Sequence, residues 1–262
     1  MNRLRAYATE GIVLRRDDYG EADRLVTLLT PEHGKLRALA KGARRLTSRK
    51  AGHIELFARA RLLLARGRTF DLITQAELVE PHRALREDVL RNAIAHYLCD
   101  LADWFAPQGS EAANLYALLV EGLALLCRAT DPRLAARAFE LRLLTLEGYR
   151  PELLRCARTS APIDIAGEAK VAFSPAEGGV LCAEAAAQAR DVIWLGRQEL
   201  ALMRLLQSQT FEALTELSVS PDLHTGVERA LQAYLSAILE RRPRTAALVR
   251  QVAGCIHGQG QG

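Results

Sequence analysis

Long apolar segments are missing from this 262-residue chain. Its unbroken apolar runs are only a few residues long, whereas a membrane-spanning helix needs about 20. The N-terminus, MNRLRAYATEG, has no apolar stretch followed by small residues, so it shows no secretory signal. We therefore expect a cytoplasmic protein without a membrane partner.

Cysteine is scarce, and its spacing predicts no disulfide framework. The five cysteines stand far apart in the sequence: Cys99, Cys127, Cys156, Cys182 and Cys255. In a cytosolic chain such residues are buried thiols or metal ligands more often than disulfides.

Familiar catalytic motifs are also lacking. The sequence contains no Gly-rich phosphate loop ending in Lys-Ser/Thr, no Gly-x-Ser-x-Gly elbow and no His-Glu-x-x-His pair. Glu21 and Asp23 are the one candidate carboxylate pair, and we interpret them as turn residues, with Asp23 pairing with Arg24 or Arg16. We therefore expect a protein that is not an enzyme and needs no cofactor.

Positive charge is concentrated at one end of the chain. Residues 1–80 contain 16 Lys and Arg against 10 Asp and Glu, a balance of +6, so the remaining 19 and 21 leave −2 and the total is +4. A basic N-terminal region indicates a polyanionic partner.

The first 80 residues have the pattern of short strands. Apolar and polar side chains nearly alternate, and turn residues such as Pro31–Gly34 and Gly67-Arg68-Thr69 separate the segments. The predicted strands are 8–16, 23–30, 36–39, 61–66 and 70–78. Five strands of this size suggest a small barrel, for which an oligonucleotide-binding (OB) barrel and an SH3-like barrel fit equally well.

From residue 81 to 262 most apolar residues recur at helical spacing. A barrel followed by helices predicts the α+β fold class. The predicted helices are 83–104, 110–127, 132–147, 197–206, 211–217 and 222–239, followed by a weakly ordered tail beyond Pro243. Residues 156–186 are richer in Gly and Pro and predict an inserted hairpin module. We expect two domains, 1–80 and 81–262.

A basic segment is the strongest local feature. Seven cations and no carboxylate lie between Glu32 and Glu55, an arrangement that gives salt-sensitive affinity for phosphates, although a merely solvated loop is the plain alternative. Aromatic rings for base stacking are few, and Phe57 is expected in the core. The predicted contacts to nucleic-acid phosphates are Lys35, Arg37, Lys41, Arg44, Arg45, Arg49 and Lys50, with Arg15, Arg16 and Arg24 as further contributors.

Six segments carry a recognisable pattern: residues 9–14, 18–24, 34–45, 71–77, 139–144 and 148–149. Together they resemble one family, the bacterial RecO DNA repair proteins. The resemblance implies an N-terminal five-stranded OB barrel, then a helical domain with a small zinc-binding insert. It also implies a recombination mediator that binds single- and double-stranded DNA, anneals complementary strands, and works with RecR and the single-stranded-DNA-binding protein to load RecA.

The insert departs from that family's pair of Cys-x-x-Cys knuckles. Cys156 and Cys182 remain, but Thr159 and Ala185 stand where the second cysteines would be. Two thiolates make a weak zinc site, so we predict no structural zinc. The module would then depend on an apolar cluster of Leu153, Val171, Phe173, Val180 and Leu181.

Two other functions remain open from the residues alone. One is a protein-interaction scaffold in which the helical domain does the binding. The other is an RNA-binding barrel, which the sequence does not distinguish from a DNA-binding one.

Overall fold

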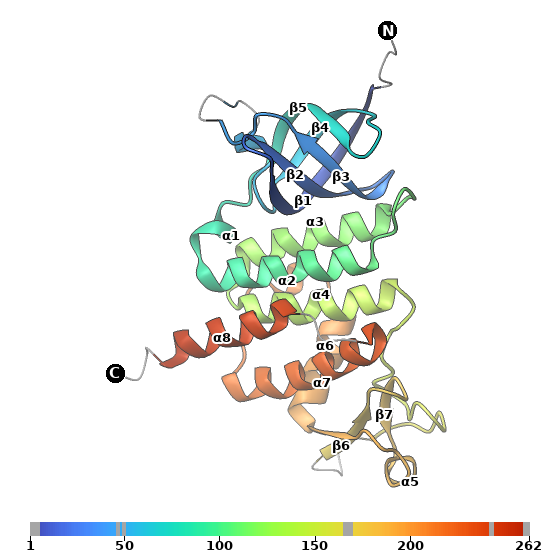
Figure 1. Cartoon of the computed structure of the whole chain (residues 1–262). Helices are drawn as coiled ribbons and strands as arrows, with labels where there is room; N and C mark the ends of the chain where they lie inside the picture. Colours follow the sequence, from blue (N-terminus) through green and yellow to red (C-terminus); the bar gives the residue numbers. More distant parts are fainter. Residues whose placement is uncertain (1–5, 46–47, 49–50, 165–169, 241–243, 259–262) are drawn as a thin grey trace. The chain divides into compact units, whose positions relative to one another are not determined.

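The computed structural model describes all residues except 1–5, 46–47, 49–50, 165–169, 241–243 and 259–262. The chain forms two compact units, residues 1–127 and 128–262. The first contains a β-barrel and helices, and the second contains further helices and a small sheet (Figure 1). Among the described residues, no helix has both the length and the apolar character needed to cross a membrane.

The N-terminal strands close into an OB barrel. The strands are β1 (Ala6–Tyr19), β2 (Asp23–Thr30), β3 (Gly34–Ala40), β4 (Arg59–Ala65) and β5 (Asp71–Glu80), and a 3₁₀ turn, η1, covers Ala51–His53. Their order around the barrel is β1-β2-β3-β5-β4, with β3 parallel to β5 and the other neighbours antiparallel. This order confirms the OB prediction over the SH3-like alternative.

Alternation along the strands separates an inner row of side chains from an outer one. Val26 and Leu28 of β2 point inward with Ala38 of β3, and Ile73 of β5 belongs to the same interior cluster. The intervening residues of β1 and β2 face outward, yet several are buried because α2 packs against β1. These outward-facing buried residues are Ile12, Leu14, Leu25 and Leu29.

The helices after the barrel differ from the predicted boundaries. The structure has α1 (Ala84–Glu87), α2 (Val89–Phe105) and α3 (Ala113–Arg128). The single helix predicted over 83–104 is interrupted at Asp88, whose φ of −112° and ψ of 126° are extended. Asp88 caps α2 by accepting a hydrogen bond from the Arg91 amide at 2.8 Å. The prediction was wrong here because the apolar spacing continues across the break.

The second unit has four long helices, α4 (Pro132–Leu146), α6 (Arg197–Ser208), α7 (Pro221–Leu239) and α8 (Arg244–Gly258). Asp131 caps α4 with Pro132 in the first turn, as predicted. The expectation of a weakly ordered tail was wrong for α8, because Ala246, Val249 and Ala253 repeat at helical spacing and are buried, and residues 259–262 lie outside the described residues. The helix predicted over 211–217 is only the 3₁₀ turn η2 (Glu212–Leu214).

The insert contains the predicted hairpin and a third strand that the sequence reading missed. The hairpin strands β6 (Lys170–Ser174) and β7 (Gly179–Leu181) pair antiparallel, and β8 (Ile193–Gly196) pairs with the other edge of β6. A short helix, α5 (Ala183–Ala186), follows β7. The predicted apolar cluster is confirmed as buried: Leu153, Val171, Phe173, Val180 and Leu181 are each at most 2% exposed.

Candidate nucleic-acid interface

The outer surface of β2 and β3 carries a row of side chains that runs across three strands. Arg15 of β1 is opposite Thr27 of β2, and Thr27 is opposite Arg37 of β3. Their neighbours Val26 and Ala38 are inside the barrel, so this row faces outward. Thr27 is only 6% exposed, so the members of this row that reach solvent are the two arginines, on the face of strands 2 and 3 that OB barrels commonly use for oligonucleotides.

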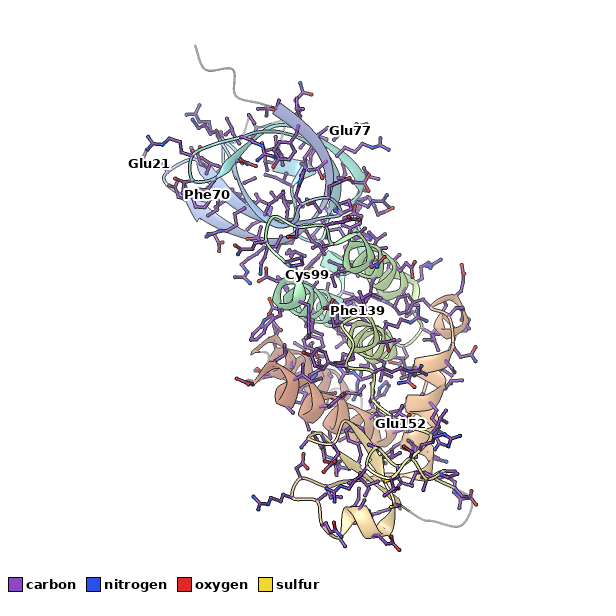
Figure 2. All side chains as sticks on the ribbon, turned by 90° about the vertical axis from the view of Figure 1, so that its right-hand side faces the viewer. Glu21, Phe70, Glu77, Cys99, Phe139 and Glu152 are labelled. Carbon is purple, nitrogen blue, oxygen red and sulfur yellow. The ribbon has the colours of Figure 1, made fainter. Side chains whose placement is uncertain are left out.

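Two aromatic rings meet beside this row. Tyr19 ends β1 and is 46% exposed, and Phe70 precedes β5. Their ring centroids are 6.1 Å apart at an interplanar angle of 83°, and the Arg37 guanidinium lies 5.1 Å from the Phe70 centroid. Figure 2 shows Phe70 on the side of the barrel that carries Glu21 of the β1–β2 turn. Phe57, by contrast, is fully buried, as predicted.

The basic loop after β3 is fastened to the β1–β2 turn. Gly42 has a φ of +68°, which favours glycine, and its amide donates to Asp23 Oδ1 at 2.7 Å. The Arg44 amide donates to the Ala22 carbonyl at 2.9 Å. Asp23 therefore holds the loop, and the prediction that it pairs with Arg24 or Arg16 was wrong.

The cations of this loop differ in how firmly they are held. Lys41 and Arg45 are exposed and form no ion pair within the described part of the chain. Arg44 is also exposed, although its guanidinium donates to the Gly20 carbonyl and lies 3.4 Å from Asp18. Arg49 and Lys50 lie outside the described residues.

Four other predicted DNA contacts are engaged within the barrel unit. Lys35 and Arg15 both form ion pairs with Asp103, at 3.2 and 2.9 Å. Arg16 pairs with Glu55 at 2.7 Å, and Arg24 lies 3.9 Å from Asp18. The Lys35 ammonium also donates to the Asp103 carbonyl. Arg15 remains half exposed, and exposed pairs of this kind exchange partners at little cost, so the DNA role of these residues stays a prediction.

The sequence reading missed two cations in the β4–β5 turn. Arg66 and Arg68 are exposed, and they immediately precede Phe70. Gly67 predicts a turn here, but the sequence alone does not show that the two cations of this turn belong to a binding surface. We call the surface formed by Tyr19, Arg37, Phe70, Arg68, Lys41, Arg44 and Arg45 the basic–aromatic face.

The insert does not fit a tetrahedral zinc site. Among the described residues, no group of three His, Cys, Asp or Glu side chains is placed to hold a metal ion. Ala185 is buried against Cys156 and Leu181, so a methyl group lies where the family pattern would supply a thiolate. The absence of zinc itself stays a prediction.

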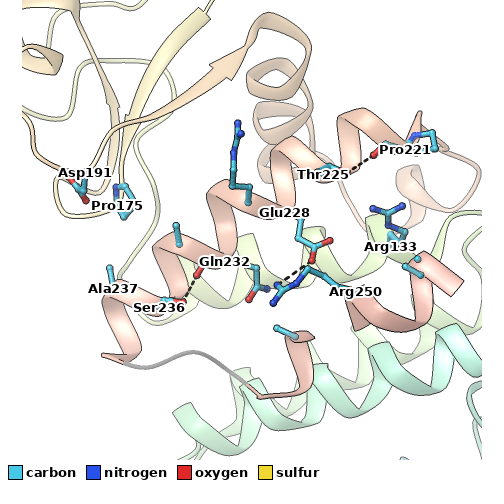
Figure 3. Close-up of a pocket in the computed structure, with 15 residues that line it drawn as sticks. Arg133, Pro175, Asp191, Pro221, Thr225, Glu228, Gln232, Ser236, Ala237 and Arg250 are labelled. Carbon is cyan, nitrogen blue, oxygen red and sulfur yellow. Dashed lines mark hydrogen bonds and ion pairs between the residues drawn. The ribbon is translucent and has the colours of Figure 1, made fainter. Parts of the chain in front are cut away.

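The second unit has a pocket of about 950 Å³ between α7, α8 and the loops of the insert (Figure 3). Ala233, Ala237 and Ala246 line it together with three arginines and two carboxylates, and Arg250 lies 3.6 Å from Glu228. Because the charges nearly balance, this pocket lacks the concentrated positive charge of a phosphate site.

The chain is similar to known proteins over most of its length. Residues 1–82 match the family model of the recombination protein O N-terminal region, and residues 86–247 match that of its C-terminal region. The chain is 42% identical over 250 residues to the "DNA repair protein RecO" of Roseiflexus sp. (strain RS-1), covering 95% of this chain and 87% of that protein. It is 39% identical over 251 residues to the protein of the same name from Desulforudis audaxviator, covering 95% and 98% of the two chains. The chain therefore belongs to the RecO family of DNA repair proteins.

Proposed function

We propose that this chain is a non-enzymatic recombination mediator that binds single- and double-stranded DNA and anneals complementary strands in the bacterial cytoplasm. With RecR, it would help to load RecA onto DNA coated by the single-stranded-DNA-binding protein. The observation that carries the proposal is the basic–aromatic face, where the exposed Tyr19 ring, the half-buried Phe70 ring and exposed cations share one side of an OB barrel. Membership of a DNA repair family supports DNA as the polyanion.

Phosphate contacts would supply most of the affinity. Lys41, Arg44 and Arg45 are exposed on one loop, and each cation that meets a phosphate releases condensed counterions. Such contacts carry no direct information about the base sequence. A mediator that acts wherever DNA is damaged needs this indifference to sequence.

Stacking would add a preference for unpaired bases. Tyr19 offers an exposed ring edge-on to Phe70, and Arg37 lies over the Phe70 ring. A base stacked on such a platform contributes roughly 1–3 kcal/mol, whichever base it is. In a duplex the bases are already stacked on one another, so duplex DNA would use the cations alone.

Strand annealing would follow from the phosphate contacts and the base stacking together. Contacts to phosphates and to the flat faces of bases leave the base-pairing edges free. A strand held in this way is extended, screened from the repulsion of a second strand, and still able to pair.

A salt titration tests the phosphate contacts. We expect wild-type affinity for an oligo(dT) probe, measured by fluorescence anisotropy, to fall steeply as salt rises. Replacing Lys41, Arg44 and Arg45 by Ala should reduce the slope of log K against log salt by roughly 2 units for single strands and 3 for duplex. An unchanged slope in a triple variant that melts cooperatively would show that the loop is solvated surface only.

The same titration separates the alternative functions. An interaction scaffold would show little affinity for DNA at any salt concentration. An RNA-binding barrel would prefer oligo(U) to oligo(dT) of the same length. Annealing of complementary strands coated with the single-stranded-DNA-binding protein, with and without this chain, then tests mediation directly.

A further inference from the structure

Hydrogen bonds bring two cysteines of the insert, Cys156 and Cys182, close together. The chain folds back at residues 154–163, where the Cys156 amide donates to the Ala161 carbonyl at 2.7 Å and the Ile163 amide donates to the Leu154 carbonyl at 3.0 Å. The next amide, that of Ala157, donates to the carbonyl of Val180 in β7 at 2.8 Å. Since Cys182 directly follows β7, this bond brings the two cysteines to the same place.

Hydrogen bonds then converge on the Cys156 sulfur. It accepts from the Thr159 hydroxyl and from the backbone amides of Arg158, Thr159 and Cys182. The Thr159 hydroxyl oxygen is also 3.9 Å from the Cys182 sulfur, so one side chain contacts both thiols. The donors that would hold a metal-bound thiolate are therefore present without the remaining metal ligands.

These donors favour the ionised form of Cys156. Burial alone would raise the pKa of this thiol, but the Thr159 hydroxyl and the three amides outweigh burial and lower the pKa to about 6. The Arg158 guanidinium next to this cluster is held by an ion pair with Glu177. The thiolate is the form of a cysteine that attacks a disulfide, and these hydrogen bonds favour it at Cys156, which is itself buried.

Two other thiols, Cys99 and Cys255, are placed differently. Cys99 is buried in α2, and desolvation together with Asp100 and Asp103 raises its pKa far above the usual range. Cys255 is exposed near the end of α8. Cys182 is half-buried and its backbone amide donates to the Cys156 sulfur, so it is the thiol placed to complete a second step.

We propose that Cys156 and Cys182 form a reversible intramolecular disulfide in place of a metal site. The Cys156 thiolate attacks a small disulfide such as glutathione disulfide, forming a mixed disulfide and releasing one glutathione thiolate. Cys182 loses its proton to solvent and attacks the Cys156 sulfur, which forms the protein disulfide and releases the second glutathione. Two protein thiols are oxidised and one small disulfide is reduced to two thiols.

The disulfide would join the two ends of the insert's hairpin module. It would close a loop from residue 156 to residue 182 that contains β6 and β7. Cross-links of this kind restrict the unfolded chain and stabilise the folded one. The insert would thus gain a covalent link under oxidising conditions and lose it when reduced.

The test uses full-length protein in which the exposed Cys255 is replaced by Ser. After incubation with glutathione disulfide, we expect intact-mass analysis to show the loss of two hydrogen atoms, and peptide mapping to join Cys156 to Cys182. Adding dithiothreitol should reverse the change. Folded protein that retains both thiols, or that links other cysteines, would overturn the proposal.

Two single variants in the same background distinguish the roles of the thiols. Cys182→Ser should stop at the mixed disulfide, with one glutathione on Cys156, whereas Cys156→Ser should react far more slowly at Cys182. Equal rates for the two variants would contradict the assigned roles. Circular dichroism checks that both variants are folded. The mass change of the parent protein tests the disulfide independently of how the two variants behave.

Thr159→Val offers a matched control, because it removes the hydroxyl donor and keeps the shape of the side chain. Alkylation of Cys156 by iodoacetamide should show a midpoint near pH 6 in the parent protein and a higher midpoint in the variant. An identical pH profile would show that Thr159 does not support the thiolate.

Discussion

The barrel carries two rows of outward side chains that are built alike and charged differently. On one side Arg15, Thr27 and Arg37 lie across β1, β2 and β3. On another, Glu10, Arg61 and Glu77 lie across β1, β4 and β5. The first row has two positive charges and the second a net charge of −1. Figure 2 shows Phe70 and Glu77 on opposite sides of the barrel.

The second row serves the fold. Glu10 Oε1 accepts hydrogen bonds from Arg59 at 2.5 Å and from the Tyr116 hydroxyl of α3 at 2.8 Å, and its other oxygen is 3.8 Å from Arg61. The charge of Glu10 is thus satisfied internally, as is that of Arg15 by Asp103, whereas Arg37 has an aromatic ring for a neighbour. Antiparallel pairing of three strands thus supports a proposed binding surface in one row and a structural network around Glu10 in the other.

Charge reversal of the basic loop should have the largest effect on this contrast. Lys41→Glu, Arg44→Glu and Arg45→Glu together replace attraction by repulsion between the loop and phosphate. We expect DNA binding and strand annealing to be lost together, measured by anisotropy and by fluorescence transfer between labelled strands. Stability should change little, because exposed charges usually contribute less than about 0.5 kcal/mol each. Retained annealing in a folded variant would move the DNA path to another surface.

Removing the two rings should have the next largest effect. Tyr19→Ala with Phe70→Ala should weaken binding to single strands by about 1–3 kcal/mol for each base that stacks, which is roughly 5- to 150-fold per base. The salt slope should stay the same, since no cation is removed. Comparing single-stranded with duplex probes checks the reason: a loss of equal size on both would rule out base stacking.

A single cation of each row gives a smaller and sharper comparison. Arg37→Ala should lower the single-strand salt slope by about 0.7, as expected for one phosphate contact. Arg61→Ala is the matched control, because Arg61 is an exposed strand arginine that lies between two glutamates. Its salt slope should equal that of the wild type. Equal losses in the two variants would show that overall charge, rather than position, governs binding.

Glu10→Gln should leave DNA affinity unchanged and lower stability by about 1–2 kcal/mol at neutral pH, measured by urea unfolding. Burial would raise the pKa of Glu10, but the hydrogen bonds from Arg59 and Tyr116 outweigh it and hold the pKa below the usual 4.5. The stabilisation is therefore complete above pH 4.5 and is lost as the pH falls through the lower, folded-state pKa. The difference between wild type and variant should shrink over that acidic window, and a constant difference would contradict this account.

Local patterns in the sequence predicted much of the fold. Alternation identified the strands of the barrel, and Asp131-Pro132 located the start of α4. The break at Asp88 and the strand β8 were missed, because the apolar spacing runs through the first and the second is only four residues long. Alternation determines which side chains face inward, but it does not determine which strands are neighbours, so the sequence does not predict the strand order.

The candidate site was predictable in its charges and not in its contacts. The loop cations follow from composition alone. The contact of Tyr19 with Phe70, and the attachment of Lys35 to Asp103, depend on residues far apart in the chain that only the closed barrel and the following helices bring together. The pairing of Asp23 with the Gly42 amide is of the same kind.

The apolar strip on the outside of β1 and β2 bears on how this molecule is dissected. Ile12, Leu14, Leu25 and Leu29 are buried although they face away from the barrel interior. A fragment that stops at Glu80 would leave this strip without α2 and expose it to water, where it would favour self-association. Binding assays on the fragment truncated at Glu80 would then be dominated by its self-association. A fragment ending at Arg128, or point substitutions in the intact chain, would allow DNA binding itself to be measured.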